Sequence, residues 1–180
     1  MNEPIQSEAF RNRIKKIGTV PRVIWLAYIG AVPLYLCVAY MLFGARAGIS
    51  NPLTIPFVII CLLTAALAPY MPRQLLPDSR LRELLNRQYP PDATLSLEEQ
   101  RLLAIVSVFF VPFIIRLAFN ESIALYGLVL AFSSRSVAVL VPFAIASLIL
   151  NLMVPYPLQM ALKRIASLGL QAGAVPTQPG

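Results

Sequence analysis

Long apolar runs alternate with short polar segments along this chain, and the lengths of the runs indicate membrane-crossing helices. The run Val23–Phe43 has no charged residue, and its 21 residues match the about 20 that a helix needs to cross about 30 Å of hydrocarbon. Three further apolar runs follow, and prolines or polar turns separate them. The pattern predicts four transmembrane helices, at residues 23–43, 52–71, 108–132 and 137–155.

A capping signature marks the start of the helix that leads into the third run. Ser96 and Glu99 have the spacing of a capping box, in which each side chain bonds the backbone N–H of the other residue. A helix from Ser96 to Phe132 would be about 54 Å long, which exceeds the thickness of a bilayer. We therefore expect one long helix, kinked near Pro112, whose second half crosses the membrane; a re-entrant first half is the alternative.

The N-terminal segment, residues 1–22, is basic and carries a narrow apolar stripe. Phe10, Ile14 and Ile17 fall on one face of a helix that Ser7 can cap. Such a helix is typical of segments that lie on an anionic membrane surface, and a basic N-terminus that only sets orientation is an equal alternative. The cations expected to contact lipid here are Arg11, Arg13, Lys15 and Lys16.

The polar loop, residues 72–101, is predicted to contain a second amphipathic helix. This helix starts at Asp78 or Ser79 and places Leu81, Leu84 and Leu85 on one side. We expect it to lie at the membrane interface, with lipid-contacting cations at Arg80, Arg82 and Arg87.

The C-terminal segment, residues 158–180, is predicted to form a third amphipathic helix followed by a disordered tail. Leu158, Leu162 and Ile165 share one side of this helix, and Lys163 and Arg164 lie opposite. These two cations are also expected to contact lipid.

Composition indicates an integral membrane protein and excludes several other classes. Hydrophobic residues make up 58% of the 180 positions and charged residues 13%, against about 25% in a soluble domain. The chain has no His, the commonest metal ligand and general base, and Cys37 and Cys61 lie in apolar runs, where packing explains them better than zinc or redox chemistry. The net charge of +7 comes from basic residues that flank apolar runs, so we expect no nucleic-acid partner. We also expect no cofactor and no metal ion.

The predicted fold is therefore all-α, with a four-helix membrane domain at residues 23–157 and interfacial amphipathic helices. Of the Lys and Arg residues, 12 lie in the two terminal segments and the 72–101 loop, whereas the two short loops hold only Arg46 and Arg135. The positive-inside rule puts both termini in the cytoplasm. Short loops and the lack of an apparent signal peptide favour a bacterial cytoplasmic membrane.

Charge inside a predicted span marks the candidate functional site. Arg116, Asn120 and Glu121 lie in the third apolar run, where a charged residue costs about 2.5–3.5 kcal/mol on insertion scales. Arg116 and Glu121 are about 140° apart around an ideal helix, so they pair only if the helix is irregular near Asn120. Otherwise burial favours the neutral acid, which can donate a hydrogen bond across helices. Its candidate partners are Thr64, Ser107 and Ser122.

Residues 118–131 contain Glu121 and Ser122 followed by the run Ala124-Leu125-Tyr126-Gly127-Leu128-Val129. This stretch resembles the ion-carrying helix of the c subunit (proteolipid) of rotary ATPases, in which a single membrane carboxylate binds the transported proton or sodium ion. The resemblance implies that Glu121 is the ion-binding carboxylate and that Ser122 and Tyr126 lie near it. The glycine-lined preceding helix of that family has no counterpart in this chain.

Three functions fit these features. The first is a non-enzymatic accessory or structural subunit of a larger membrane assembly, in which the Arg116, Asn120 and Glu121 group joins helices or subunits. The second is a proton- or ion-handling subunit in which Glu121 titrates, which requires an oligomer or partner subunits. The third is a membrane enzyme that holds a lipid phosphate with the arginines of the loop. In each case the expected partners are anionic lipids of the cytoplasmic leaflet.

Overall fold

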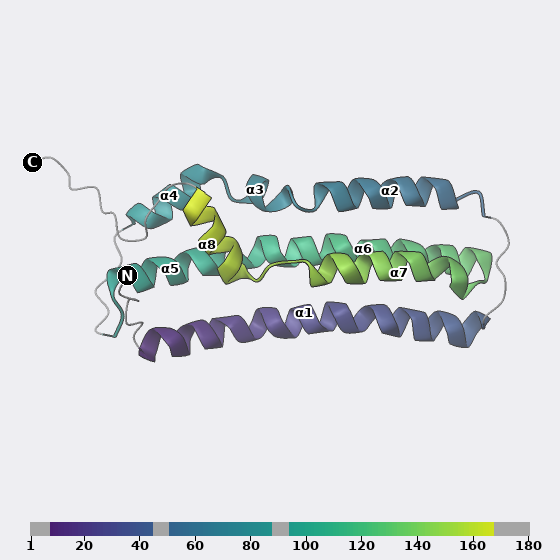
Figure 1. The fold of residues 1–180 in the computed structure, drawn as a ribbon, viewed down its shortest axis with the longest axis horizontal. Coiled ribbons are helices and arrows are strands. Elements are labelled where there is room, and N and C mark those ends of the chain that lie inside the picture. Colours follow the sequence, from purple (N-terminus) through teal and green to yellow (C-terminus); the bar gives the residue numbers. More distant parts are fainter. Residues whose placement is uncertain (1–7, 45–50, 88–93, 168–180) are drawn as a thin grey trace, which may run out of the picture. The chain divides into compact units, whose positions relative to one another are not determined.

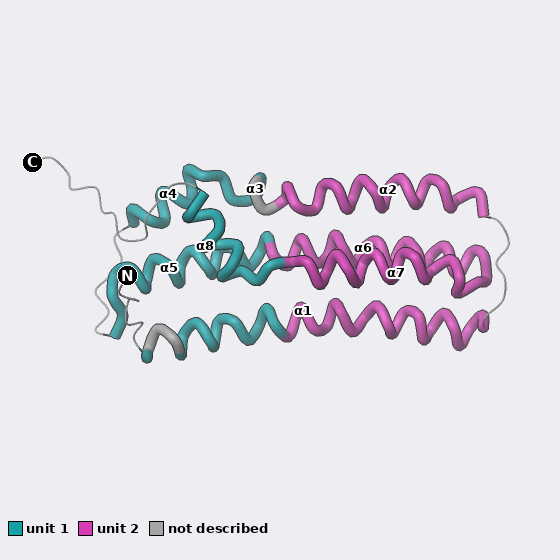
Figure 2. The backbone as a smooth tube through the Cα atoms, viewed as in Figure 1, with its two compact units in different colours: residues 1–22, 73–112, 155–180 teal, residues 23–72, 113–154 magenta. Residues whose placement is uncertain are grey.

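The structure is a computed structural model that describes residues 8–44, 51–87 and 94–167, and every regular element in these ranges is an α-helix (Figure 1). The prediction of an all-α fold is confirmed. In chain order the helices are α1 (Glu8–Phe43), α2 (Thr54–Leu67), α3 (Met71–Leu75), α4 (Asp78–Asn86), α5 (Leu97–Val108), α6 (Phe110–Ser134), α7 (Val137–Leu152) and α8 (Pro157–Ser167). The chain divides into two compact units, and boundaries between them fall inside α1, α3 and α6 (Figure 2).

Unit 2, residues 23–72 and 113–154, is built around α6 and α7, with α1 and α2 on either side of this pair (Figure 1). Val32 of α1 packs in one cluster with Ala124 of α6. Cys61 of α2 packs in a second cluster with Ile123 of α6 and Phe143 of α7. Alanines recur in the first cluster. Their small side chains let the helix backbones approach closely, so that van der Waals contacts hold the helices together.

Unit 1, residues 1–22, 73–112 and 155–180, places α5 against α4 and α8. Ile14 and Ile17 of α1 pack on a cluster formed by Leu95 and Leu103. The predicted apolar stripe of the N-terminal helix therefore contacts protein, at least through these two residues; the side chain of Phe10 is outside the described set. The helix is also not separate, because α1 continues from Glu8 into the first apolar run.

The long helix after the capping box is interrupted at one residue. Ser96 accepts from the backbone N–H of Glu99, and the Glu99 carboxylate accepts from the backbone N–H of Ser96, which confirms the predicted start. α5 then ends at Val108 and α6 begins at Phe110. Pro112 accounts for the break, because it has no N–H to offer the Val108 carbonyl four residues earlier and its ring clashes with that carbonyl.

The polar turn predicted at residues 133–136 is confirmed. Arg135 has a positive φ of 50°, and the backbone N–H of Ser136 donates to the Ala131 carbonyl at 3.1 Å. This is the hydrogen bond of a Schellman motif, which closes α6 and lets α7 start directly. Asn51 Nδ2 donates to Ser133 Oγ at 2.7 Å. This hydrogen bond joins the segment before α2 to the C-terminal end of α6.

The lengths of the helices only partly agree with four predicted spans. Among the described residues, Asn12–Phe43 and Leu97–Ser134 are long and apolar enough to cross a membrane, and α7 with α8 makes a third candidate if the two count as one interrupted span. α2 has 14 residues, about 21 Å, so it is shorter than the span predicted over 52–71, and that span is not confirmed. Pro69 explains its early end, because proline has no N–H to donate to the Ala65 carbonyl four residues earlier.

The two short amphipathic helices form close to where the sequence predicted them. α4 starts at Asp78 and buries Leu81, as expected. α8 starts at Pro157, but its buried side consists of Pro157, Met160, Ala161 and Ile165, whereas Leu162 is 48% exposed. Of the predicted face Leu158, Leu162 and Ile165, only Ile165 is therefore buried, and the buried side of α8 is centred on Met160 and Ala161 instead. The predicted breaker at residues 89–92 and the tail lie largely outside the described residues.

Candidate functional site

Glu121 is the centre of a buried polar cluster inside unit 2. Its side chain lies in the middle of α6 and the residue is 5% exposed. Asn151 of α7 donates from Nδ2 to Glu121 Oε2 at 3.4 Å, a long hydrogen bond. Tyr35 of α1 and Ser147 of α7 turn their hydroxyls toward the same carboxyl. The carboxyl therefore meets polar groups from two other helices, and we call these four residues the Glu121 cluster.

α7 supplies two members of the cluster because of their spacing. Ser147 and Asn151 are four residues apart, so they lie one turn above each other on the same helix face, and both are 0% exposed. The backbone carbonyl of Asn151 accepts from Trp25 Nε1 of α1 at 3.0 Å. α1 and α7 are thus joined by a hydrogen bond next to the carboxyl that both of them face.

Three atoms of the cluster lack a normal hydrogen bond. Glu121 Oε1, Ser147 Oγ and Asn151 Oδ1 are fully buried and none has a partner of suitable geometry among the described residues. Unsatisfied buried polar atoms cost about 1–3 kcal/mol each. Adding one proton to the carboxyl supplies a further donor to this set, in which the Asn151 oxygen can only accept and the Ser147 hydroxyl can donate or accept. A small cation or a water molecule is the other way to satisfy these oxygens.

The predicted grouping of Arg116, Asn120 and Glu121 is only partly found. Asn120 is buried, at 2% exposed, and Arg116 is half-buried. No hydrogen bond or ion pair joins Arg116 to either of the other two in the described structure, and Arg116 Nε is itself buried without a partner. α6 runs through Asn120 as an uninterrupted helix, so the irregularity that would bring Arg116 to Glu121 does not occur.

The other polar groups predicted to meet Glu121 bond elsewhere. Thr64, Ser107 and Ser122 each donate to a backbone carbonyl of their own helix, three or four residues earlier. This local bond is available to any Ser or Thr within a helix, so it competes with a contact across helices. Tyr126, the other site residue that the c-subunit resemblance implies, packs against Phe57 of α2, with ring centroids 5.6 Å apart.

Sequence reasoning missed Tyr35, Ser147 and Asn151. A signal was present, because Ser147 and Asn151 are two polar residues at helical i, i+4 spacing within an otherwise apolar run. A buried carboxyl needs partners on another helix, and this pair is the polar face that the last run offers. Tyr35 carried no comparable signal, because an interfacial position explains a tyrosine in a span equally well. Cys37, which was expected to be buried, is exposed on α1.

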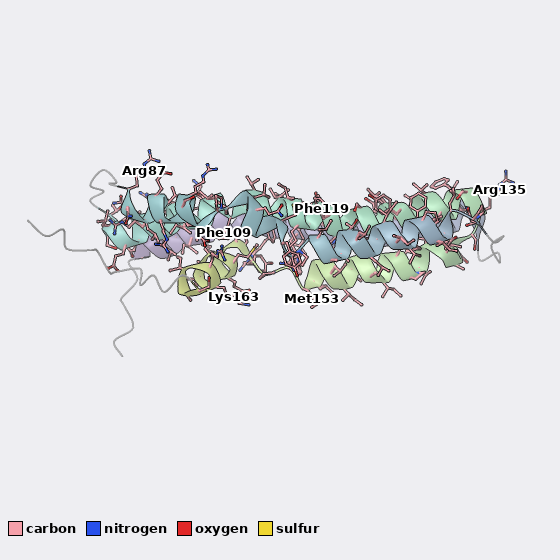
Figure 3. All side chains as sticks on the ribbon, turned by 90° about the horizontal axis from the view of Figure 1, so that it is seen from above. Arg87, Phe109, Phe119, Arg135, Met153 and Lys163 are labelled. Carbon is pink, nitrogen blue, oxygen red and sulfur yellow. The ribbon has the colours of Figure 1, made fainter. Side chains whose placement is uncertain are left out.

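Most of the cations expected to contact lipid have exposed side chains. Exposed side chains are found at Arg13, Lys15, Lys16, Arg80, Arg82, Arg87 and Lys163, whereas the side chain of Arg11 is outside the described set. Figure 3 shows Lys163 directed away from α8, and Arg87, which directly follows α4, also directed outward. Arg164 differs, because it is half-buried and forms an ion pair with Asp78, which links α8 to α4.

The described residues contain no group of three or more His, Cys, Asp or Glu side chains that could hold a metal ion. Comparisons with models of known protein families, with curated proteins and with solved structures find no match to this chain. The geometry of the Glu121 cluster therefore carries the functional argument alone.

Proposed function

We propose that this chain is a non-enzymatic integral membrane protein that serves as an accessory, structural subunit of a larger membrane assembly. The observation that supports it is the Glu121 cluster, in which one carboxyl on α6 meets Tyr35 of α1 and Ser147 and Asn151 of α7. In an apolar surrounding, polar side chains that bond across helices hold a bundle together, because the alternative is an unsatisfied group in hydrocarbon. Because no Lys or Arg among the described residues pairs with Glu121, the neutral acid is the form that this role requires.

The proposal includes four crossings, with both termini in the cytoplasm of a bacterial cell. In this arrangement α2 and α7, which have 14 and 16 residues, cross together with the irregular segments that follow them. Single cysteines in place of Arg87 and Arg135, in a chain whose Cys37 and Cys61 are replaced by Ala, test the topology. A membrane-impermeant maleimide should label position 135 in intact cells and position 87 only after permeabilisation. Labelling of both positions in intact cells would contradict four crossings.

The structural role is tested with Glu121→Gln and Glu121→Leu in mild detergent. Gln keeps the shape of the neutral acid and can both donate to Asn151 Oδ1 and accept from its Nδ2, so it should keep stability and co-purifying subunits. Leu leaves the buried Asn151 amide without its partner, so it should lower thermal stability and lose those subunits. Ser122→Ala, which removes only a local bond, is the matched control. Equal behaviour of Leu and wild type would remove the support for this proposal.

A second function, proton or cation handling, is favoured by the three unpartnered oxygens of the cluster. Oxygens from Glu, Ser and Asn are suitable ligands for a proton or a hard cation, and intramembrane carboxylates are associated with proton relays. Proton flux after reconstitution separates the two functions. A Glu121→Gln variant that keeps its fold and partners but loses a flux shown by wild type would establish the second function.

A further inference from the structure

We propose that a groove in unit 1 binds one anionic phospholipid, whose phosphate is held by Lys15 and Arg22 and whose acyl chain lies on the apolar wall between them and α8. The groove is formed by α1, α5, α8 and Phe110, which is the first residue of α6. It encloses about 440 Å³. This volume falls within the about 300–1,000 Å³ that is usual for ligand pockets. All of its lining residues belong to unit 1.

The charges of the groove fit an anionic amphiphile. Among the described residues, Lys15 and Arg22 are the charged residues that line the groove, and no Asp or Glu lines it. The rest of the wall is mainly apolar, with Val106, Phe110 and Leu162 among its members. A ligand that matches this surface needs one anionic end and one hydrocarbon end, which is the chemistry of a phospholipid such as phosphatidylglycerol.

The helix geometry of α1 opens the groove at Gly18. Lys15, Gly18 and Arg22 follow at spacings of three and four residues, so they share one face of α1. A Cβ built on Gly18 would have no atom within 4 Å, and the space over this residue is therefore open. Lys15 and Arg22 thus lie on either side of the open position at Gly18, which can accept an acyl chain or a head group.

The position of Arg22 along α1 favours a lipid over a soluble ligand. Arg22 is the last charge before the uncharged run Val23–Phe43, so it marks the boundary at which α1 passes from the polar to the apolar environment. Lipid phosphates occupy that same depth, and long basic side chains extend toward it. Leu162, which lines the groove, is 48% exposed, and an acyl chain in the groove would cover it.

The test is native mass spectrometry of the full chain released from mixed micelles that contain phosphatidylglycerol, phosphatidylcholine or palmitate. Wild type should retain one phosphatidylglycerol at a concentration about tenfold lower than it needs for phosphatidylcholine. Lys15→Gln with Arg22→Gln should remove this preference, and Lys15→Arg with Arg22→Lys should keep it. Gly18→Leu, which fills the open position, should lower retention of both lipids about tenfold.

Two control variants separate the groove from general charge and general packing. Lys16→Gln removes an adjacent exposed cation outside the lining, and Gly30→Leu fills another open glycine position of α1; both should bind as wild type does. The proposal fails if Lys16→Gln loses the preference as strongly as the double variant. It also fails if palmitate or phosphatidylcholine is retained as well as phosphatidylglycerol, or if the retained mass is a second copy of the chain. Far-ultraviolet circular dichroism of each variant confirms that helix content is unchanged.

Discussion

Gly127 of α6 lies directly against Phe143 of α7: a Cβ added at Gly127 would be 2.5 Å from Phe143 Cβ and 2.9 Å from Phe143 Cγ. The nearer of these atoms is fixed to the α7 backbone, so it cannot move aside by rotation of a side chain. We expect Gly127→Ala to push the two helices apart and to lower the free energy of unfolding by about 1–3 kcal/mol. Thermal unfolding in detergent, followed by circular dichroism, measures the change.

Gly30→Ala is the matched control for this prediction. Gly30 is also inside a helix, but a Cβ at this position meets nothing within 4 Å. Ala is the better helix former, so this change should leave stability equal or raise it by up to about 1 kcal/mol. If both alanine variants gain stability, close packing at Gly127 is not what the residue provides.

The contact between Glu121 and Asn151 should be measurable as a coupling energy. Single changes Glu121→Leu and Asn151→Leu each leave buried polar atoms of the other residue unpaired, whereas the double variant removes both. The sum of the two single losses should therefore exceed the loss in the double variant. Hydrogen bonds between membrane helices have coupling energies that average about 0.6 and reach about 1.7 kcal/mol, so a value in this range is expected. A coupling of zero would contradict the contact, and Glu121→Leu with Thr64→Val serves as an uncoupled reference pair.

Features set by neighbours in sequence were predictable, and features set by packing were not. The capping box at Ser96 and the turn at Arg135 depend on four to six consecutive residues, and both were found where the sequence placed them. The partners of Glu121 lie on other helices, and hydropathy does not show which face of one span meets which face of another. The length of α2 was missed for a different reason, because an apolar run continues through Pro69 although the helix does not.

Removal of the capping box should loosen the start of α5 without affecting the rest of the protein. Ser96→Ala removes the oxygen that accepts from the Glu99 backbone N–H at 3.2 Å, and such losses cost about 0.5–2 kcal/mol. Hydrogen exchange of the Glu99 and Gln100 amides, which donate to Ser96, should become faster by about tenfold. Ser107→Ala, which removes a hydroxyl from the exposed face of the same helix, should leave these amides unchanged.

The backbone of Arg135 has the left-handed conformation, with a φ of 50°. Left-handed geometry costs about 1–2 kcal/mol for residues with a Cβ, and glycine avoids this cost. Arg135→Gly should therefore stabilise the α6–α7 turn by about 1 kcal/mol. Arg135→Val should destabilise it, because a β-branched side chain tolerates this φ least. The two variants should shift the melting temperature in opposite directions; a shift in the same direction would show that charge, not conformation, is decisive at this position.

The ion pair between Asp78 and Arg164 joins α4 to α8 within unit 1, and its side chains are 47% and 24% exposed. At this exposure water and salt screen the attraction, so a coupling of at most about 1 kcal/mol is expected from a double-mutant cycle with Asp78→Asn and Arg164→Gln. The coupling should fall as NaCl rises from 0.05 to about 1 M, where the Debye length shortens to about 3 Å. Exchanging the two residues, Asp78→Arg with Arg164→Asp, should restore most of the coupling. The restoration is incomplete because position 78 is in the first turn of α4, where the helix dipole disfavours a positive charge. A coupling that is large and insensitive to salt would instead mean that the pair is shielded from water, for example by lipid over α8.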